Sequence, residues 1–345
     1  MNILKLSITM LTLSMILSCK DDPTSHNNTN PFSFTKGEYY SIAFLGDQIF
    51  VGGDCNGILG AKVQNIAMWD GTRWSPMEEG LSGSVKAIAV LGNDVYAGGN
   101  FTMAGELEVN CIAKWDGIHW SALGRGMNGS VLALAVIGNT LFAGGEFITS
   151  GGALTGRIAK WDGTSWSSLG SGFNGKVRTL AVVGDKLYAG GDFTGTGEQS
   201  INRIAKWDGA IWSSLGNGLD GAVYSIAVNG NDLYAGGTFE VAGKDSICGL
   251  ARWDGSVWST PGMWKNGYVM VIAADENKIY AGGWNFVVHG DGKNWNMMPG
   301  EFYDQWFNVR TLACNNGNVY MGGCFCWECS CDYLYRWNGS VWLPM

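Results

Sequence analysis

The densest group of reactive side chains is a set of four cysteines within eight residues, Cys324, Cys326, Cys329 and Cys331. Four thiolates can hold a structural zinc ion, but such sites usually combine Cys-x₂₋₄-Cys pairs from two separate elements. Disulfides are the competing interpretation, and they are typical of exported proteins with an even number of pairing cysteines. Because the N-terminus carries an export signal, we favour disulfides and expect no metal at this group.

Two further cysteines are candidates for pairing with that group. Cys55 occupies the matching loop of the first sequence repeat, and the repeats described below are expected to close into a ring in which the first and last are neighbours. We therefore predict that at least one disulfide joins Cys55 to the four-cysteine group. Cys111 ends the same loop of the second repeat and is a further candidate, whereas Cys314 is expected to be a free core thiol.

Carboxylates are the other residues whose spacing permits chemistry. Glu146 and Asp192 occupy equivalent positions in neighbouring repeats, and glycoside hydrolysis uses a pair of carboxylic acids. With Asp54 and Asn100 they also offer the oxygen ligands that Ca²⁺ prefers, although no ordered calcium loop is present. Carboxylates alone are weak evidence for either chemistry, so we expect no cofactor and keep Ca²⁺ as the alternative.

Histidine-dependent and nucleophilic catalysis have little support in the sequence. The three histidines are His26, His119 and His289, which lie in unrelated segments. No Gly-x-Ser-x-Gly, His-Glu-x-x-His or phosphate-binding loop occurs. We therefore predict no catalytic residues.

The net charge of the 345-residue chain is −8, with the acidic residues spread along the sequence. Nucleic-acid-binding proteins concentrate Lys and Arg to neutralise phosphates. This charge argues against a nucleic-acid partner and favours solubility.

Residues 1–18 have the charge and the apolar run of a signal peptide. Ile16-Leu17-Ser18-Cys19 resembles the lipobox of bacterial lipoproteins, which implies cleavage before Cys19 and lipidation of that residue; an ordinary secretory signal is the alternative. Lys20-Asp21-Asp22 resembles the export signal of surface lipoproteins in Bacteroidetes-type bacteria, or it is a solvated run of charges. Residues 19–36 are polar and indicate a flexible tether. We expect an outer-membrane, lipid-anchored and surface-exposed protein.

The remainder, residues 37–345, is a sequence repeat. Gly-Gly pairs begin at Gly52, Gly98, Gly144, Gly190, Gly236, Gly282 and Gly322, spaced by 46 residues five times and then by 40. Each copy contains four short strand signals separated by turn residues. Seven such copies predict an all-β, seven-bladed β-propeller of four-stranded antiparallel blades. Trp pairs five residues apart, such as Trp161 and Trp166, are interpreted as core, with sugar stacking as the alternative.

The order of alternating strand, Tyr-x-Gly-Gly, variable loop, aromatic-Asp turn and Trp-containing strand resembles the kelch repeat of galactose-oxidase-like propellers. The Leu-Tyr-Ala-Gly-Gly and Trp-Asp-Gly-x-x-Trp segments are more similar still to the repeats of Rax2-like cell-polarity proteins. The resemblance implies that the first strand of each blade lines the channel and the fourth lies outside. The chain then starts on an inner strand near Tyr39 and ends on an outer strand near Trp342, without a strand shared across the ring closure.

Positions that differ between near-identical repeats are free to recognise a partner. They comprise the second residue of each inner strand and the residue after each Gly-Gly, and they are expected on one face, the loop-bearing rim. The candidate ligand-binding residues are Tyr40, Lys86, Arg178, Tyr224, Arg310, Asp54, Asn100, Glu146, Asp192 and Trp284. Drift at exposed positions is the competing explanation.

The sequence therefore predicts a monomeric, surface-anchored lipoprotein that acts as a non-catalytic binding module for a protein or glycan partner. The alternative is a carbohydrate-active enzyme, a glycoside hydrolase or lyase, on the same scaffold.

Overall fold

The computed structural model describes residues 37–58, 63–243, 245–262, 267–275, 278–300, 307–324 and 332–345. The chain divides into two compact units, Met1–Phe32 and Ser33–Met345, and every described residue belongs to the second. The signal peptide, Cys19 and the tether at 19–36 therefore lie outside the described residues, as do Cys326, Cys329 and Cys331. Within the described ranges there is no helix long and apolar enough to cross a membrane.

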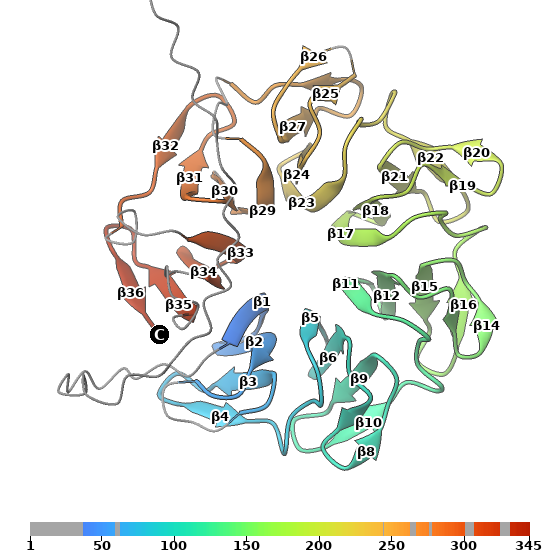
Figure 1. The fold of residues 1–345 in the computed structure, drawn as a ribbon, viewed down its shortest axis with the longest axis vertical. Helices are drawn as coiled ribbons and strands as arrows, with labels where there is room; N and C mark the ends of the chain where they lie inside the picture. The colour runs from blue at the N-terminus through green and yellow to red at the C-terminus, as the bar shows by residue number, and fades with distance from the viewer. Residues whose placement is uncertain are drawn as a thin grey trace, which may run out of the picture. The chain divides into compact units, whose positions relative to one another are not determined.

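The described residues form seven four-stranded antiparallel sheets arranged as the blades of a β-propeller (Figure 1). Blade one consists of β1 (Gly37–Leu45), β2 (Gln48–Cys55), β3 (Ile66–Trp69) and β4 (Trp74–Pro76). Blade two consists of β5 (Val85–Leu91), β6 (Asp94–Gly99), β9 (Ile112–Trp115) and β10 (Trp120–Ala122). Blade three consists of β11 (Val131–Ile137), β12 (Thr140–Gly145), β15 (Ile158–Trp161) and β16 (Trp166–Ser168). Blades four and five are β17 (Val177–Val183), β18 (Lys186–Gly191), β21 (Ile204–Trp207), β22 (Trp212–Ser214); β23 (Val223–Asn229), β24 (Asp232–Gly237), β27 (Leu250–Trp253), β28 (Trp258–Ser259). Blades six and seven are β29 (Val269–Ala274), β30 (Ile279–Gly283), β31 (Phe286–Gly290), β32 (Trp295–Met297); β33 (Asn308–Asn315), β34 (Asn318–Cys324), β35 (Asp332–Trp337), β36 (Trp342–Pro344).

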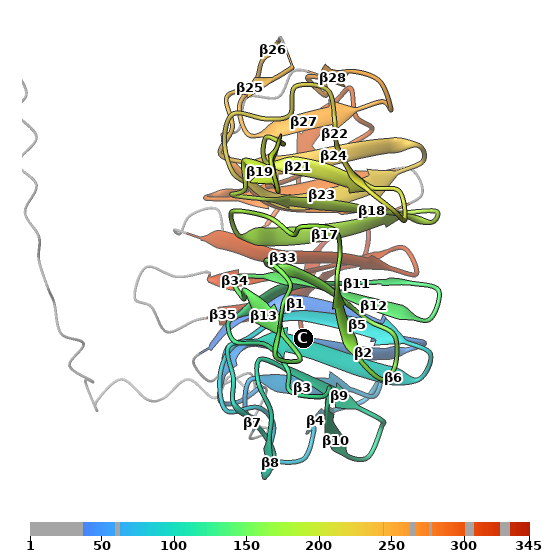
Figure 2. The same cartoon turned by 90° about the vertical axis from the view of Figure 1, so that its right-hand side faces the viewer.

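Blades two to five also carry a small hairpin between their second and third strands. These hairpins are β7 (Met103–Ala104) with β8 (Leu107–Glu108), β13 (Thr149–Ser150) with β14 (Ala153–Leu154), β19 (Gly195–Thr196) with β20 (Gln199–Ser200), and β25 (Val241–Ala242) with β26 (Asp245–Ser246). The first strands of successive blades, such as β5, β11 and β17, lie side by side around the centre of the ring (Figures 1 and 2). The predicted fold is therefore confirmed.

The Gly-Gly pairs are required by close approaches on both sides of the second strand. A Cβ on Gly190 would lie 2.6 Å from Cγ1 of Val223, the first residue of the next inner strand. A Cβ on Gly191 would lie 2.0 Å from the carbonyl oxygen of Lys176, which directly precedes β17. Real side chains do not tolerate such distances, so the first glycine admits the neighbouring blade and the second admits the blade's own backbone.

The Trp pairs belong to the core, as predicted. Trp161 and Trp166 are only 9% and 8% exposed, and their ring centroids are 5.3 Å apart in a tilted arrangement. Nε1 of Trp166 donates a hydrogen bond of 2.9 Å to the carbonyl oxygen of Leu123 in the preceding blade. The corresponding Trp of blades two, four and five makes the same bond, so in blades two to five the fourth strand is joined to the preceding blade.

The ring closes by side-chain packing without a shared strand. β1 pairs only with β2 inside blade one, and β36 is the outer strand of blade seven. Tyr39 and Trp74 of blade one pack with Tyr320 and Leu334 of blade seven in one buried cluster. The predicted closure is thus confirmed, and burial of these large side chains holds the two ends together.

The cysteine predictions stay largely open. Cys55 is buried in the closure cluster and Cys111 in the cluster between blades two and three. No disulfide joins any two of the described cysteines, and three members of the four-cysteine group lie outside the described residues. Cys314 is a free thiol, and burial raises its pKa to about 12.

Substituting Trp166→Ala should lower the free energy of unfolding by about 3–5 kcal/mol, because it removes a buried ring and an interblade hydrogen bond. Trp284→Ala is the matched control: its side chain is 60% exposed, so the change should stay within about 0.5 kcal/mol. Urea unfolding followed by circular dichroism measures both. Equal losses for the two variants would contradict the assignment of Trp166 to the core.

Candidate functional site

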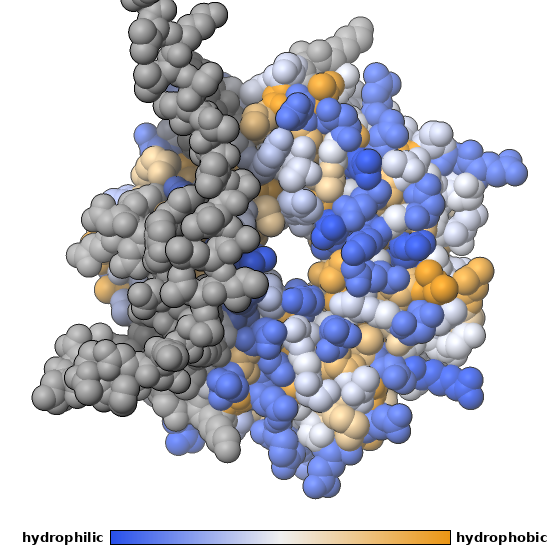
Figure 3. All heavy atoms as spheres, viewed as in Figure 1, coloured by the Kyte–Doolittle hydropathy of each residue, from blue (hydrophilic) through white to orange (hydrophobic). Residues whose placement is uncertain are grey.

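A β-bulge places the rim residues. In every blade the pairing of the first two strands shifts register around the second residue of the inner strand. The residues at the shift are Tyr40, Lys86, Leu132, Arg178, Tyr224, Met270 and Arg310, all of them half-buried. A bulge re-aims the side chain of its extra residue, which explains why these positions vary between blades without disturbing the sheet. Polar residues gather around the central opening, most visibly over β17 (Figure 3).

The first rim cluster spans blades three to five. The guanidinium of Arg178 binds the carboxylate of Asp192 through two bonds of 2.7 Å, and its central carbon lies 5.1 Å from the ring centroid of Tyr224. The carboxylate of Glu146 is paired with Lys176 at 2.5 Å. The hydrogen bonds that Arg178 donates to Asp192 raise the pKa of the guanidinium further. Four of the predicted residues therefore lie in one cluster. The bidentate geometry fixes the orientation of two of them, Arg178 and Asp192.

The second rim cluster lies where the ring closes. Nζ of Lys86 lies 3.3 Å from the ring centroid of Tyr40, and the guanidinium carbon of Arg310 lies 6.0 Å from it. The hydroxyl of Tyr40 donates to Glu38, whose carboxylate is 3.5 Å from Nη2 of Arg310. Burial lowers the pKa of Lys86 and raises that of Tyr40. Two cations thus lie near one aromatic ring in a half-buried setting.

Glu38 and Lys176 were missed by the sequence-based list of rim residues. Lys176 directly precedes β17, whereas Glu38 is the second residue of β1. The equivalent residues of the other blades are Ser84, Ser130, Ala222, Tyr268 and Asn308. These positions differ between blades as much as the predicted ones do. The same internal comparison, extended two residues toward the N-terminus of each inner strand, would have found them.

Three predicted residues lie outside these pairings. Asp54 is exposed and acts on Lys86 only through its charge. Asn100 is exposed as well, with its backbone N–H bound to the carbonyl of Ser84 at 2.9 Å. Trp284 follows β30 in blade six and is 60% exposed. The described part of the rim therefore contains two clusters of mutually paired polar side chains and one exposed aromatic side chain, Trp284.

A pocket of about 260 Å³ opens beside the rim, between the loops of blades four and five. Its lining includes Asn217, Asp220 and Val241, together with Arg203, whose guanidinium donates to the carbonyl of Asp192. Oδ1 of Asp220 accepts hydrogen bonds of 2.9 Å from the backbone N–H groups of Glu240 and Val241. Loops on a rigid scaffold are the usual place for binding.

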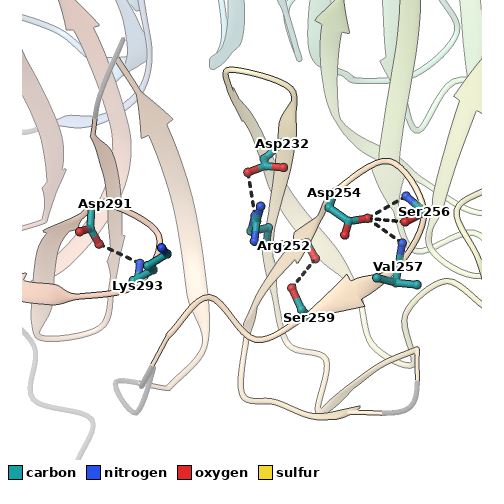
Figure 4. A network of polar contacts seen from close by, with 8 residues as sticks. All are labelled: Asp232, Arg252, Asp254, Ser256, Val257, Ser259, Asp291 and Lys293. Carbon is teal, nitrogen blue, oxygen red and sulfur yellow. Dashed lines mark hydrogen bonds and ion pairs between the residues drawn. The ribbon is translucent and has the colours of Figure 1, made fainter.

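Other charged groups of the propeller are structural. Oδ1 of Asp254 accepts hydrogen bonds from the N–H groups of Ser256 and Val257 at 2.8 and 2.9 Å, which builds the predicted Asp-Gly turn (Figure 4). These bonds lower the pKa of Asp254 to about 2. Asp232 and Arg252 form a 2.7 Å ion pair between the second and third strands of the same blade. These carboxylates serve the scaffold, which leaves the rim as the candidate site.

The described part of the chain contains no group of three or more His, Cys, Asp or Glu side chains arranged to hold a metal ion. The carboxylates of Glu146 and Asp192, expected as ligands if Ca²⁺ binds, face Lys176 and Arg178 instead. The expectation of no cofactor, with Ca²⁺ as the alternative, stays untested.

A double-mutant cycle tests whether the first cluster is a real interaction. Arg178→Ala and Asp192→Ala, alone and together, should show a coupling of about 1 kcal/mol, because the pair is bidentate and partly buried. The exposed pair Asp185 and Lys186 is the control and should show no measurable coupling. Urea unfolding of the variants measures the coupling. Absence of coupling at Arg178 would contradict the geometry described here.

No family model matches the sequence, and no curated protein matches it either. Among solved structures, the chain is similar to the computationally designed Ika8 protein, with 17% identity, a TM-score of 0.56, and coverage of 91% of this chain and 87% of that chain. It is also similar to the WD40 β-propeller domain of Doa1, with 13% identity, a TM-score of 0.56, and coverage of 85% and 92%. At these identities the likeness shows the fold alone, and the resemblance to kelch and Rax2-like repeats stays a prediction. The comparisons and the geometry agree on a β-propeller.

Proposed function

We propose that this protein is a non-catalytic binding module whose loop-bearing rim engages a protein or glycan partner. The observation that carries the proposal is the set of bulged positions. One repeated scaffold presents a different side chain at most of them, including Lys86, Arg178 and Tyr224, while the Gly-Gly pairs recur in every blade. Propeller scaffolds often mediate protein binding, and rigid scaffolds with variable loops suit recognition.

The proposed location is the cell surface. Under this proposal Cys19 carries the lipid, and residues 19–36 form the tether between the membrane and the propeller. Lipidation with two or more chains gives stable anchoring. The rim would then meet partners outside the cell, with the protein acting as a monomer.

The enzymatic alternative has weaker support from the rim. A glycoside hydrolase or lyase needs carboxylates that reach the substrate. The two candidates, Glu146 and Asp192, are engaged by Lys176 and Arg178. Binding is therefore the function that we argue.

The test is a binding measurement on the purified full chain, using a glycan array and a panel of purified surface proteins. The double variant Arg178→Ala/Tyr224→Ala should lower affinity for the bound partner about tenfold, the effect of losing roughly 1.4 kcal/mol of contact. The control is Asp47→Asn/Ile211→Ala, because both residues are exposed in turns at the other ends of their strands.

Two results would contradict the proposal. Turnover of any bound sugar would establish an enzyme. Equal losses for the rim variant and the control would place binding away from the rim.

A further inference from the structure

Blade six has an aromatic corner that the other blades lack. Trp284 and Tyr268 are 60% and 42% exposed, unusual values for such large side chains. The residues equivalent to Trp284 are Asp54, Asn100, Glu146, Asp192, Thr238 and Cys324. Both aromatic residues therefore depart from the repeat at positions where the scaffold needs no aromatic ring.

The backbone brings these two residues together. Tyr268 directly precedes β29 and Trp284 directly follows β30, and these strands pair antiparallel with Val269 opposite Gly283. A Cβ on Gly283 would lie 2.6 Å from the carbonyl oxygen of Tyr268. Tyr268 and Trp284 therefore flank the same end of the β29–β30 pair, and the backbone of Trp284 also bridges to Asn308 of blade seven.

The charged residues that the structure describes beside these two rings are acidic. The hydroxyl of Tyr268 donates a 3.0 Å hydrogen bond to Oε1 of Glu240, in the loop between β24 and β25 of blade five. Asp220 is tied to the same loop through the backbone N–H of Glu240. The hydrogen bond and the charge of Glu240 raise the pKa of Tyr268, and Cys248 and Asp220 act in the same direction. The ring of Tyr268 therefore borders the carboxylate of Glu240 and lies in the field of Asp220.

We infer that the corner formed by Trp284, Tyr268, Glu240 and Asp220 binds a cationic side chain, lysine or arginine, of a protein partner. Aromatic faces attract ammonium and guanidinium groups, and cages of aromatic residues are the usual receptors for such cations. The net charge of −8 attracts a basic partner over a longer range. This inference rests on the proposed binding function, and it specifies that the partner presents a lysine or arginine side chain.

A neutral sugar is the other ligand that stacks on an exposed indole. It would use the ring of Trp284 but gain nothing from the charges of Glu240 and Asp220. The negative surroundings of Tyr268 therefore favour a cation.

The experiment uses the full chain and three unstructured Gly/Ser peptides of equal length, carrying four lysines, four acetyl-lysines or four glutamates. Fluorescence anisotropy of the labelled peptides gives affinities at low and physiological salt. The lysine peptide should bind at least tenfold more tightly than the other two, and its affinity should fall with salt because the attraction is electrostatic.

Variants locate the binding. Trp284→Leu keeps an apolar side chain but removes the aromatic face, and it should weaken the lysine peptide about fivefold, whereas Trp284→Phe should retain most of the affinity. Glu240→Gln should weaken binding by a similar factor. Asp47→Asn removes the same charge from an exposed turn at the far end of β1 and should change the affinity less than twofold.

Three outcomes would overturn the inference: equal binding of the acetylated peptide, equal losses for Glu240→Gln and Asp47→Asn, or binding of neutral oligosaccharides in place of the lysine peptide. Its failure is distinguishable from failure of the proposed function. If the binding panel finds a partner whose binding is lost in the Arg178/Tyr224 variant, but the lysine peptide does not bind, the proposed binding function stands and the cation site is refuted. Lysine-peptide binding lost in Trp284→Leu, without any partner in the panel, would keep the cation site alone.

Discussion

The structure depends on a contact that leaves no room for a side chain. At the second glycine of each Gly-Gly pair, a Cβ would lie 1.9–2.6 Å from the carbonyl oxygen that precedes the inner strand. At the first glycine in blades one to six, a Cβ would lie 2.4–2.7 Å from the valine that begins the next inner strand. Only glycine permits both approaches. The same residue pair therefore sets the spacing within a blade and the packing between blades.

The bulge follows from that contact, and the rim follows from the bulge. The shift in register falls between the residue opposite the second glycine and the residue opposite the first, as at Val177 and Thr179 of blade four. The residue between them is released from the ladder, and its side chain is free to differ from one blade to the next. The Gly-Gly pair, which recurs in every blade, thus lies opposite a position that differs from blade to blade.

Among the described residues, some rim side chains form hydrogen bonds and ion pairs with one another, whereas that of Trp284 does not. Arg178 and Asp192 are bidentate partners, and Lys86, Arg310 and Glu38 converge on Tyr40. Such clusters stiffen the inner wall of the ring. The side chain of Trp284 makes no hydrogen bond or ring contact with another described residue, and it is largely exposed. This contrast is why the open corner, and not the charged clusters, carries the inference about partner chemistry.

Much of this architecture was predictable because it is periodic. The repeat spacing predicted seven blades, and the regular Trp pairs predicted the core. The resemblance to kelch repeats implied the order of strands from inside to outside. The pairing of Arg178 with Asp192 was not predictable, because it depends on how the bulge in β17 aims the Arg178 side chain. The pairing of Tyr268 with Glu240 was not predictable either, because it joins two loops whose conformations no repeat specifies. Glu38 was missed for a simpler reason, since it lies two residues before Tyr40, the position compared in blade one. The cysteine network and the lipid anchor involve residues outside those that the structure describes.

The most direct test of the central claim is the free energy of unfolding of Gly191→Ala, measured by urea titration of the full chain. We expect a loss of more than about 4 kcal/mol, or failure to fold, because the added methyl meets the carbonyl of Lys176. Gly184→Ala is the comparison: its φ is +59° with nothing within 4 Å of the added Cβ, so it should lose only about 1 kcal/mol. A Gly191→Ala protein as stable as the Gly184→Ala protein would contradict the claim that this contact organises the ring.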